Sequence, residues 1–335
     1  MHKVWKSGWK KMSLLPDKSE LETAAAIVYR SVKPTPQYAW PLLAQRLGTE
    51  VWVKHENHLP IGAFKLRSAL VYFDELRRRE PEVRGVITAT RGNHGQAVAY
   101  AARQLGLEAT VVVPHGNSRE KNAAMRALGA ELIEHGQDFQ ESVGHAVELA
   151  RQRGLYRVPS FHRDLMRGAA TFWLELFTAV PELDVVFAPI GMGSNICGAA
   201  AARAATGSRA RIIGVVSDRA TAYAQSFAER RIVESPVSTR LADGLACRTP
   251  DPDAMAIIWE VVDEMVQVSE DEVAAAMAAY FTDTHNVAEG AGAAALAAAL
   301  KLADRLRGKR IGLPLTGGNV DRELFAEVLS GMNRD

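Results

Sequence analysis

Short runs of β-branched and other apolar residues alternate along most of the chain with longer segments whose apolar residues recur at helical spacing. The predicted strands are 50–54, 85–89, 109–113, 131–133, 184–189, 211–216 and 311–315. The predicted helices are 19–29, 41–47, a segment from Lys65 to just before Pro81, 96–105, 120–128, 139–151, 165–177, 196–204 and 291–299. Such alternation predicts an α/β fold with two doubly wound domains, each with a parallel sheet flanked by helices.

Several helix ends and faces carry local signals. Ser19 is the predicted N-cap of the first helix, and Glu22 completes a capping box with it. Gly48 is predicted to end the helix 41–47, since glycine is the usual residue just past a helix. The alanine-rich segment 291–299 is predicted to be a packed helix, with Leu296 and Leu300 on its inner face.

The composition narrows the classes of function. The chain has 335 residues, of which 47% are hydrophobic and 24% charged, as in an ordinary globular protein. Its net charge of +1 would attract neither nucleic acid nor an anionic membrane, and no apolar run approaches the roughly 18–20 residues of a membrane-spanning helix. Two cysteines, Cys197 and Cys247, are too few for a disulfide framework and fit a reducing compartment. We therefore expect a cytoplasmic protein with neither a nucleic-acid nor a membrane partner.

One lysine stands out among the predicted elements. Lys65 follows the strand 50–54 and a glycine-containing turn, and it opens an amphipathic helix. An ammonium group at this place faces the positive end of the helix dipole, which disfavours its charge. A lysine that loses its proton readily is a nucleophile, and its usual partner is a carbonyl cofactor such as pyridoxal 5'-phosphate. Taken alone, an ordinary surface lysine is the better interpretation, and only the remaining loops change it.

Three glycine-containing loops follow predicted strands, the place where parallel sheets bind their ligands. The first, T-R-G-N-H-G at 90–95, precedes a helix whose free N–H groups can receive a carboxylate. The second, G-M-G-S-N at 191–195, has the form of a phosphate cradle, with Ser194 and Asn195 as additional donors. The third, L-T-G-G-N at 315–319, places a hydroxyl beside two glycines. Each loop by itself is as typical of a plain strand–helix turn as of a site.

In their order along the chain, G-A-F-K-L-R, R-G-N-H-G, G-M-G-S-N and T-G-G-N resemble motifs of the pyridoxal-phosphate enzymes of fold type II, that of the tryptophan-synthase β-subunit. Within that group the chain resembles the threonine/serine dehydratases over roughly residues 20–330. The pairing of T-R-G-N-H-G with K-H-E-N-H-x-P-x-G-A-F-K is most similar to the dehydratases that act on phenylserine. The resemblance implies a lyase of amino-acid catabolism that forms a homodimer or a higher homo-oligomer.

The resemblance also implies two domains and a role for each motif residue. The large, cofactor-binding domain would comprise 12–80 and 163–335, with Met12 as a possible natural start, and the small domain 81–162. Lys65 would hold pyridoxal 5'-phosphate as a Schiff base. The ring would be contacted by Phe64 on one side, by Gly244 on the other, by Asn93 at the phenolic oxygen and by Thr316 at the pyridine nitrogen. The phosphate would be held by Gly191, Met192, Gly193, Ser194 and Asn195. The substrate carboxylate would be bound by Thr90, Asn93 and His94, with Arg91 beside them.

Two departures from the related families bear on the chemistry. Arg91 occupies the position of the second serine in the S-S-G-N-H loop of related racemases, where that serine protonates the opposite face of the substrate. We expect Arg91 to grip a carboxylate or to stack on a planar group, unless it points into solvent. Val216, Ala220 and Ala222 stand where several relatives carry the carboxylates that bind a divalent ion, so no metal is expected there.

The motifs together predict a pyridoxal-phosphate-dependent dehydratase, which converts a β-hydroxy-α-amino acid to a 2-oxo acid and ammonia by α,β-elimination. L-threo-Phenylserine, giving phenylpyruvate, is the first expected substrate. The alternatives are threonine or serine, giving 2-oxobutanoate or pyruvate, and serine racemisation, against which Arg91 argues. A cysteine-synthase-like transferase is opposed by the R-G-N-H-G loop. A binding protein without activity is opposed by the intact Lys65.

Overall fold

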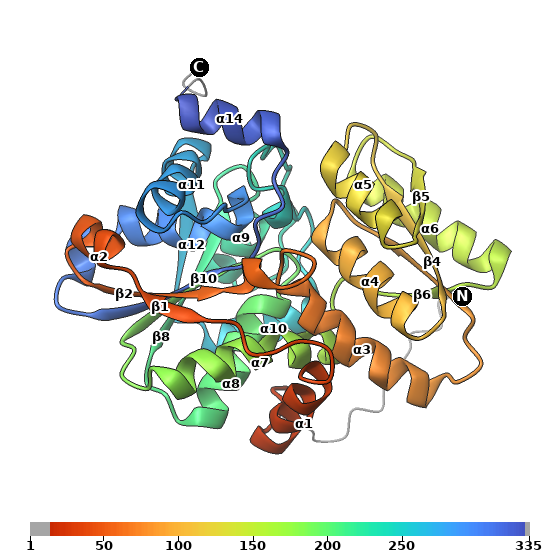
Figure 1. The fold of residues 1–335 in the computed structure, drawn as a ribbon, viewed down its shortest axis with the longest axis horizontal. Helices are drawn as coiled ribbons and strands as arrows, with labels where there is room; N and C mark the ends of the chain where they lie inside the picture. Colours follow the sequence, from red (N-terminus) through yellow and green to blue (C-terminus); the bar gives the residue numbers. More distant parts are fainter. Residues whose placement is uncertain (1–13, 332–335) are drawn as a thin grey trace.

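Two β-sheets flanked by helices form the part of the chain that the computed structural model describes, residues 14–331 (Figure 1). Met12 lies outside these residues. The first sheet has six strands in the order β1-β2-β10-β7-β8-β9. Their bounds are β1 (Gln37–Ala39), β2 (Glu50–His55), β10 (Arg310–Leu315), β7 (Val185–Pro189), β8 (Arg211–Ser217) and β9 (Glu264–Val268). All neighbours in this sheet run parallel except β1, which is antiparallel to β2.

The second sheet has four parallel strands in the order β5-β4-β3-β6. Their bounds are β5 (Glu131–Glu134), β4 (Glu108–Val113), β3 (Gly85–Ala89) and β6 (Tyr156–Arg157). This sheet lies within residues 81–162, called the small unit below, and the remaining described residues are called the large unit. The predicted α/β fold with two parallel sheets flanked by helices is thus confirmed, except that the edge strand β1 is antiparallel. The domain boundaries stay a prediction.

Helices fill the connections between these strands. Those up to the end of the small unit are α1 (Lys18–Val28), α2 (Pro41–Leu47), α3 (Lys65–Arg79), α4 (Asn93–Gln104), α5 (Arg119–Ala127) and α6 (Phe139–Arg153). Those that follow are α7 (Arg163–Ala179), α8 (Ser194–Thr206), α9 (Ala222–Glu229), α10 (Pro252–Val261), α11 (Glu270–Thr284), α12 (Gly290–Lys301), α13 (Ala303–Leu306) and α14 (Arg322–Ser330). Short 3-10 turns are η1 (Glu56–His58) and η2 (Asp243–Leu245).

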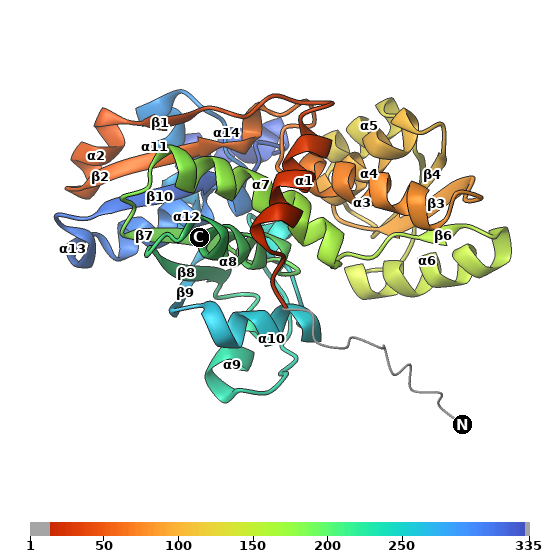
Figure 2. The same ribbon diagram turned by 90° about the horizontal axis from the view of Figure 1, so that it is seen from below.

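Side chains that alternate along the six-stranded sheet enter two different hydrophobic clusters. Val185 and Phe187 of β7 belong to a cluster with α11 and α12, whereas Val186 and Ala188 of the same strand belong to one with α7 and α8. Figure 2 shows α7 and α8 lying along this sheet. Parallel strands are apolar on both faces and need cover on both, so only their ends are left open for a site.

The alanine-rich helix α12 carries part of the site on its backbone. Its residues from Gly290 to Ala299 are all buried, and Leu296 lies on the inner face as predicted, whereas Leu300 is only half-buried. A Cβ atom on Gly292 would lie 2.2 Å from the carbonyl oxygen of Gly317. The small residues therefore let α12 touch the T-G-G-N loop directly.

The start of the first helix differs from the prediction. The N-cap of α1 is Asp17 rather than Ser19, and the capping box is completed by Glu20 rather than Glu22. The Asp17 carboxylate accepts from the Glu20 N–H at 2.9 Å, and the Glu20 carboxylate accepts from the Asp17 N–H at 2.8 Å. Aspartate and serine cap helices about equally well, so the sequence contains two overlapping start signals. The predicted end of α2 is confirmed, because Gly48 adopts a φ of 65°.

Several elements near the C-terminal end of the large unit were not predicted, among them α9, α10, α11, β9 and α14. The alanine-rich sequence of α11 offers little contrast between a polar and an apolar face, which is the contrast that reveals a helix in a sequence. Among the described residues, no helix has the length and apolar character needed to cross a membrane.

Candidate active site

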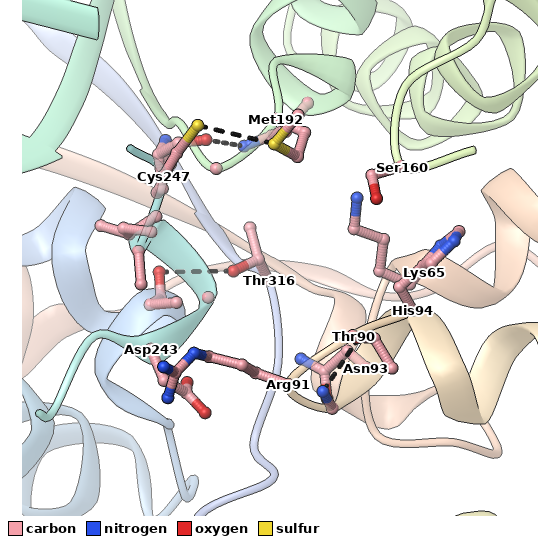
Figure 3. Close-up of a pocket in the computed structure, with 18 of the residues that line it drawn as sticks. Lys65, Thr90, Arg91, Asn93, His94, Ser160, Met192, Asp243, Cys247 and Thr316 are labelled. Atoms are coloured by element: carbon pink, nitrogen blue, oxygen red, sulfur yellow. Dashed lines mark hydrogen bonds between the residues drawn. The ribbon is translucent and has the colours of Figure 1, made fainter. Parts of the chain in front are cut away.

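The predicted site loops converge on one cavity between the two sheets. Strands β2, β10 and β7 are adjacent, and the stretch that ends in Lys65 and the loops at 191–195 and 316–319 follow their carboxyl ends. The loop 90–95 follows β3 of the small unit and closes the cavity from the other side. The cavity encloses about 940 Å³, its open mouth included (Figure 3). It is lined by every residue to which the sequence assigned a role, namely Phe64, Lys65, Thr90, Arg91, Asn93, His94, Gly191, Met192, Gly193, Ser194, Asn195, Gly244 and Thr316.

Backbone contacts hold Lys65 at the bottom of this cavity. Lys65 is the first residue of α3, as predicted. The Phe64 N–H, one residue earlier, donates to the carbonyl oxygen of Thr316 at 3.0 Å. Ala63 and Gly317 form an isolated antiparallel bridge beside it. The backbone at Lys65 is therefore tied to the loop that follows β10.

The Lys65 amine opens onto the cavity but has protein on all other sides. Its Nζ donates to the Ser194 hydroxyl at 3.1 Å and lies 5.0 Å from the centre of the Phe64 ring. Within residues 14–331 no carboxylate forms an ion pair with it. Burial, which penalises the ammonium form, lowers the pKa of Lys65 from 10.5 to about 8. From the sequence we expected the helix dipole to have this effect, and burial is the cause that the structure identifies.

The loop after β7 has the geometry of an anion site. Gly193 adopts a left-handed φ of 99° and is the N-cap of α8, so the first N–H groups of the helix have no side-chain cap. A Cβ on Gly191 would lie 2.4 Å from the carbonyl oxygen of Gly244. Gly193 is thus required for its left-handed backbone conformation. Gly191 is required because the chain at Gly244 passes too close to leave room for a side chain.

The Asn195 side chain makes two hydrogen bonds inside the protein. Its Nδ2 donates to the carbonyl oxygen of Pro189 at 2.9 Å, and its Oδ1 accepts from the Trp173 indole at 3.0 Å. The side chain is therefore used inside the protein, where it anchors the start of α8 to β7. Its role as a phosphate donor stays a prediction.

The loop 90–95 brings a neutral imidazole to the cavity. Its turn is stabilised by the Thr90 hydroxyl, which accepts from the Gly92 N–H at 3.0 Å, and α4 begins at Asn93. His94 is buried, and its Nε2 has no hydrogen-bond partner among the described residues. Burial, and next the charge of Lys65, lower the pKa of His94 to about 3. His94 is therefore uncharged near neutral pH.

Arg91 borders both this cavity and an adjoining groove, which it shares with Phe139 and Ala246. Its Nε is buried without a hydrogen-bond partner, and no residue within 14–331 forms an ion pair with its guanidinium. In Figure 3 its side chain runs across the cavity toward the side on which Asp243 lies. A buried and unpaired guanidinium nitrogen is costly, which favours a ligand for Arg91 over the solvent-pointing alternative.

Thr316 offers a neutral hydroxyl at the floor of the cavity. It is 5% exposed, and its Oγ1 lies 3.5 Å from the carbonyl oxygen of Ala291 in α12, at the outer limit of a hydrogen bond. The hydroxyl thus keeps the capacity to bond to a ligand that enters the cavity.

Sequence reasoning missed three charged residues of this cavity, Lys121, Asp243 and Glu289. Asp243 lies beside Gly244, and Glu289 directly precedes the glycine-containing start of α12, so both stood next to visible signals. Lys121 carries no local signal, because its partner Asp243 is 122 positions away. The cavity also contains Ser160 and Cys247, which were not assigned a role in it.

The divalent-ion position of some relatives is apolar here. Val216, Ala220 and Ala222 are all buried and offer no ligand oxygen from their side chains. In the described part of the chain, no group of three or more His, Cys, Asp and Glu side chains has the arrangement of a metal site.

Known proteins resemble this chain over most of its length. The sequence profile described as "Pyridoxal-phosphate dependent enzyme" matches residues 28–317. An L-threonine ammonia-lyase of Geobacter sulfurreducens is 38% identical over 288 residues, which cover 85% of this chain and 71% of that protein. The L-threo-3-hydroxyaspartate ammonia-lyase of Saccharomyces cerevisiae is 32% identical, over 95% of this chain and 98% of that protein. The processed form of threonine deaminase isoform 2 from Solanum lycopersicum superposes with a TM-score of 0.86 at 30% identity, over 95% of both chains.

The lowered pKa of Lys65 predicts how its amine reacts with an aldehyde. Only the neutral amine adds to a carbonyl carbon, and the neutral fraction grows as the pH rises through the pKa. We expect the rate at which cofactor-free protein captures pyridoxal phosphate, followed by visible absorbance, to rise with pH and to level off above about 8. Nα-acetyl-lysine in the same buffers corrects for the titration of the aldehyde itself. A rate that keeps rising toward pH 10.5, the ordinary value, would contradict the effect of burial.

Proposed function

Because the chain belongs to the pyridoxal-phosphate-dependent enzymes and resembles their threonine ammonia-lyases, we propose that it converts a β-hydroxy-α-amino acid to a 2-oxo acid and ammonia. The single observation that carries this proposal is the Lys65 amine. Its pKa is lowered to about 8, it lies 3.1 Å from the first residue of α8, and it shares a cavity with the loop 90–95. A nucleophilic amine, an anion cradle and a carboxylate loop are what an α,β-elimination on this cofactor requires.

The substrate that we place first differs from the one expected from the sequence. Phenylserine was placed first there on the motif T-R-G-N-H-G, with threonine or serine as the alternative. Two of the relatives described above are named for threonine, which supports the alternative, and one is named for 3-hydroxyaspartate. We therefore propose threonine or serine as the substrate, ahead of phenylserine.

The residues of the cavity fit the cofactor. Gly191 and Gly193 leave room for a phosphate against the backbone at the start of α8, and a side chain at Gly191 would collide with Gly244. The Ser194 hydroxyl lies between this cradle and Lys65. We propose that Phe64 and Gly244 contact the two faces of the pyridine ring, and that Asn93 and Thr316 face its phenolic oxygen and its nitrogen.

The cofactor supplies an electron sink for the pair of electrons left when the α-proton is removed. With the cofactor bound there, the Lys65 amine would be the base that takes this proton. We propose that the N–H groups at the start of α4, with Thr90 and the neutral His94, hold the substrate carboxylate. A neutral imidazole in that position adds no second positive charge beside Lys65, so it does not lower the basicity of the amine further.

Thr316 bears on the choice between elimination and side reactions. A hydroxyl stabilises a positively charged pyridine nitrogen less than a carboxylate does. Thr316 would therefore leave a bound cofactor a weaker electron sink than a carboxylate would, which favours elimination over racemisation or transamination. The buried position of Thr316 beside α12 keeps water from taking over this contact.

Lys65→Ala tests the proposal itself. We expect 2-oxo acid release from threonine and serine to be lost, because the base alone contributes about 10²–10⁴ in rate and the covalent attachment of the cofactor is lost with it. Release is measured with a coupled 2-oxo acid assay on protein supplied with pyridoxal phosphate. Lys33→Ala, at an exposed lysine, is the matched control. Turnover by Lys65→Ala close to that of the wild type would refute the proposed function.

Thr316→Asp tests the contact at the pyridine nitrogen. A carboxylate there would stabilise the protonated ring, so the visible absorbance of the bound cofactor should shift and the ratio of elimination to transamination should fall. The product ratio with L-serine and the absorbance spectrum measure the two effects. Thr316→Ser keeps a hydroxyl and should retain the wild-type ratio. An aspartate variant with unchanged ratio and spectrum would place Thr316 away from the ring.

Arg91→Lys tests whether the planar guanidinium has a ligand. Lysine keeps the charge but loses the two-pronged donor and the flat face, so either a carboxylate grip or stacking should suffer. We expect kcat/KM on the preferred substrate to fall by at least tenfold, about 1.4 kcal/mol of transition-state stabilisation. Kinetics are measured with threonine, serine, phenylserine and 3-hydroxyaspartate.

The pattern of losses in the Arg91→Lys variant identifies the ligand. A uniform loss assigns Arg91 to the α-carboxylate, a loss confined to 3-hydroxyaspartate assigns it to a side-chain carboxylate, and one confined to phenylserine assigns it to stacking. Wild-type kinetics with all four would return Arg91 to the solvent-facing interpretation. The wild type should also form no D-serine from L-serine, since Arg91 replaces the proton donor of the racemases, and D-serine would revive the racemase alternative.

A further inference from the structure

Lys121 of α5 links the small unit to the large unit across the cavity. Its ammonium donates to both carboxylate oxygens of Asp243, at 2.7 and 3.0 Å, and lies 3.1 Å from Oε2 of Glu289. Asp243 begins η2 and Glu289 directly precedes α12, so both carboxylates belong to the large unit. The side chains of Lys121 and Glu289 are only 6% and 4% exposed. This ion cluster lies inside the protein and on the wall of the cavity.

The cluster continues through Glu289 to the Asn93 amide. Oε1 of Glu289 accepts from Asn93 Nδ2 at 2.5 Å. Oδ1 of Asn93 accepts in turn from Asn319 Nδ2 at 2.8 Å, and Asn319 also donates to the carbonyl oxygen of Ile61. Both ends of the Asn93 amide are therefore fixed by the large unit. Among the described residues, its second N–H has no acceptor and remains available to a ligand.

Two motif glycines leave the space that this cluster occupies. A Cβ on Gly92 would lie 2.5 Å from Cδ of Lys121, and a Cβ on Gly317 would lie 2.4 Å from Oε1 of Glu289. From the sequence we expected the glycines of these loops to admit a ligand close to the backbone. At these two positions they admit the lysine stem and the glutamate instead, so the loops are shaped around the cluster.

The charges of the cluster depend on one another. Burial opposes the charge of Lys121, but the carboxylates of Asp243 and Glu289 outweigh it and raise the pKa of Lys121. Burial has the largest effect and raises the pKa of Glu289; Lys121 opposes this effect and Asp243 adds to it, so the pKa stays above its ordinary value. Without the ammonium, two buried carboxylates would face each other, and Glu289 would take up a proton. A protonated Glu289 gains a donor and loses part of its acceptor capacity, so it holds the Asn93 amide less firmly than the carboxylate does.

We propose that Lys121 is a positioning residue: through its contact with Glu289, it fixes the Asn93 amide with its free N–H toward the phenolic oxygen of the cofactor. The same contacts join the small unit to the large unit over the bound ring. This inference rests on the proposed function, since it assigns the ligand of the free N–H to pyridoxal phosphate. It assigns a role in the site to Lys121, a residue that has no direct contact with the reacting atoms.

Lys121→Met, Glu289→Gln and the double variant form a double-mutant cycle that tests this coupling. The readouts are the Kd of pyridoxal phosphate, from titration of cofactor-free protein, and the wavelength of the bound cofactor's visible band. We expect Lys121→Met to raise Kd by at least about tenfold and to shift the band, because the Asn93 donor is no longer held in place. In the Glu289→Gln background the same lysine change should alter Kd by less than about threefold, because the carboxylate through which Lys121 acts is already absent.

The double variant keeps the test decisive if Lys121→Met alone does not fold, because it removes the cation together with one of the carboxylates that the cation neutralises. Lys54→Met is the matched control, since Lys54 is also buried and paired with a carboxylate, Glu175, but does not line the cavity. It should lower the melting temperature while leaving the band in place. A band that moves in Lys54→Met would mean that any loss of a buried lysine disturbs the site, and would overturn the inference.

Two further results would overturn it. One is Lys121→Met with wild-type Kd and spectrum. The other is a lysine change that costs as much in the Glu289→Gln background as in the wild type, since Lys121 would then not act through Glu289. Failure of the proposed function looks different. In that case the wild type itself would bind no pyridoxal phosphate or release no 2-oxo acid, whatever the Lys121 variants do.

Discussion

The site depends on an amine that the protein encloses without neutralising it. Two other lysines are buried among the described residues, and each has a carboxylate beside it, at 2.5 Å for Lys54 and 2.7 Å for Lys121. Lys65 has only the Ser194 hydroxyl and the Phe64 ring, and burial lowers its pKa to about 8. The lowered pKa of Lys65 therefore depends on the distance of anionic side chains from its amine as well as on its burial.

The fold supplies this environment through two sheets that meet at the ends of their strands. Ends of parallel strands gather loops and helix N-termini, which hold anions without carrying a full charge of their own. The phosphate cradle at α8 and the loop at α4 are both of this kind. The charged residues of the cavity are either paired, as Lys121 is with Asp243 and Glu289, or placed toward the adjoining groove, as Arg91 is. The amine, the cradle and the carboxylate loop thus meet in one enclosed space.

Local patterns in the sequence predicted the fold and the residues that line the site. They did not predict the ion pairs that join distant parts of the chain across it. Lys65, the glycines of 191–193 and Thr316 each belong to short motifs, and all line the cavity. The Lys121 cluster joins residues far apart in sequence, so no window of the chain reveals it. Asn195 shows that a motif does not reveal every contact of its residues. Its position suggested a phosphate donor, and its side chain also bonds to Pro189 and Trp173. The start of α1 was misplaced for a third reason, since Asp17 and Ser19 offered equivalent caps.

Covalent capture of the cofactor tests the central claim most directly. Holoenzyme is reduced with borohydride, which makes the bond between the cofactor and its lysine permanent, and the protein is digested and mapped by mass spectrometry. The lowered pKa and the open cavity around Lys65 predict that the phosphopyridoxyl group is found on the peptide that contains Lys65. Modification of Lys121 in its place, or spread over exposed lysines without a dominant site, would contradict the assignment of Lys65 as the reactive amine.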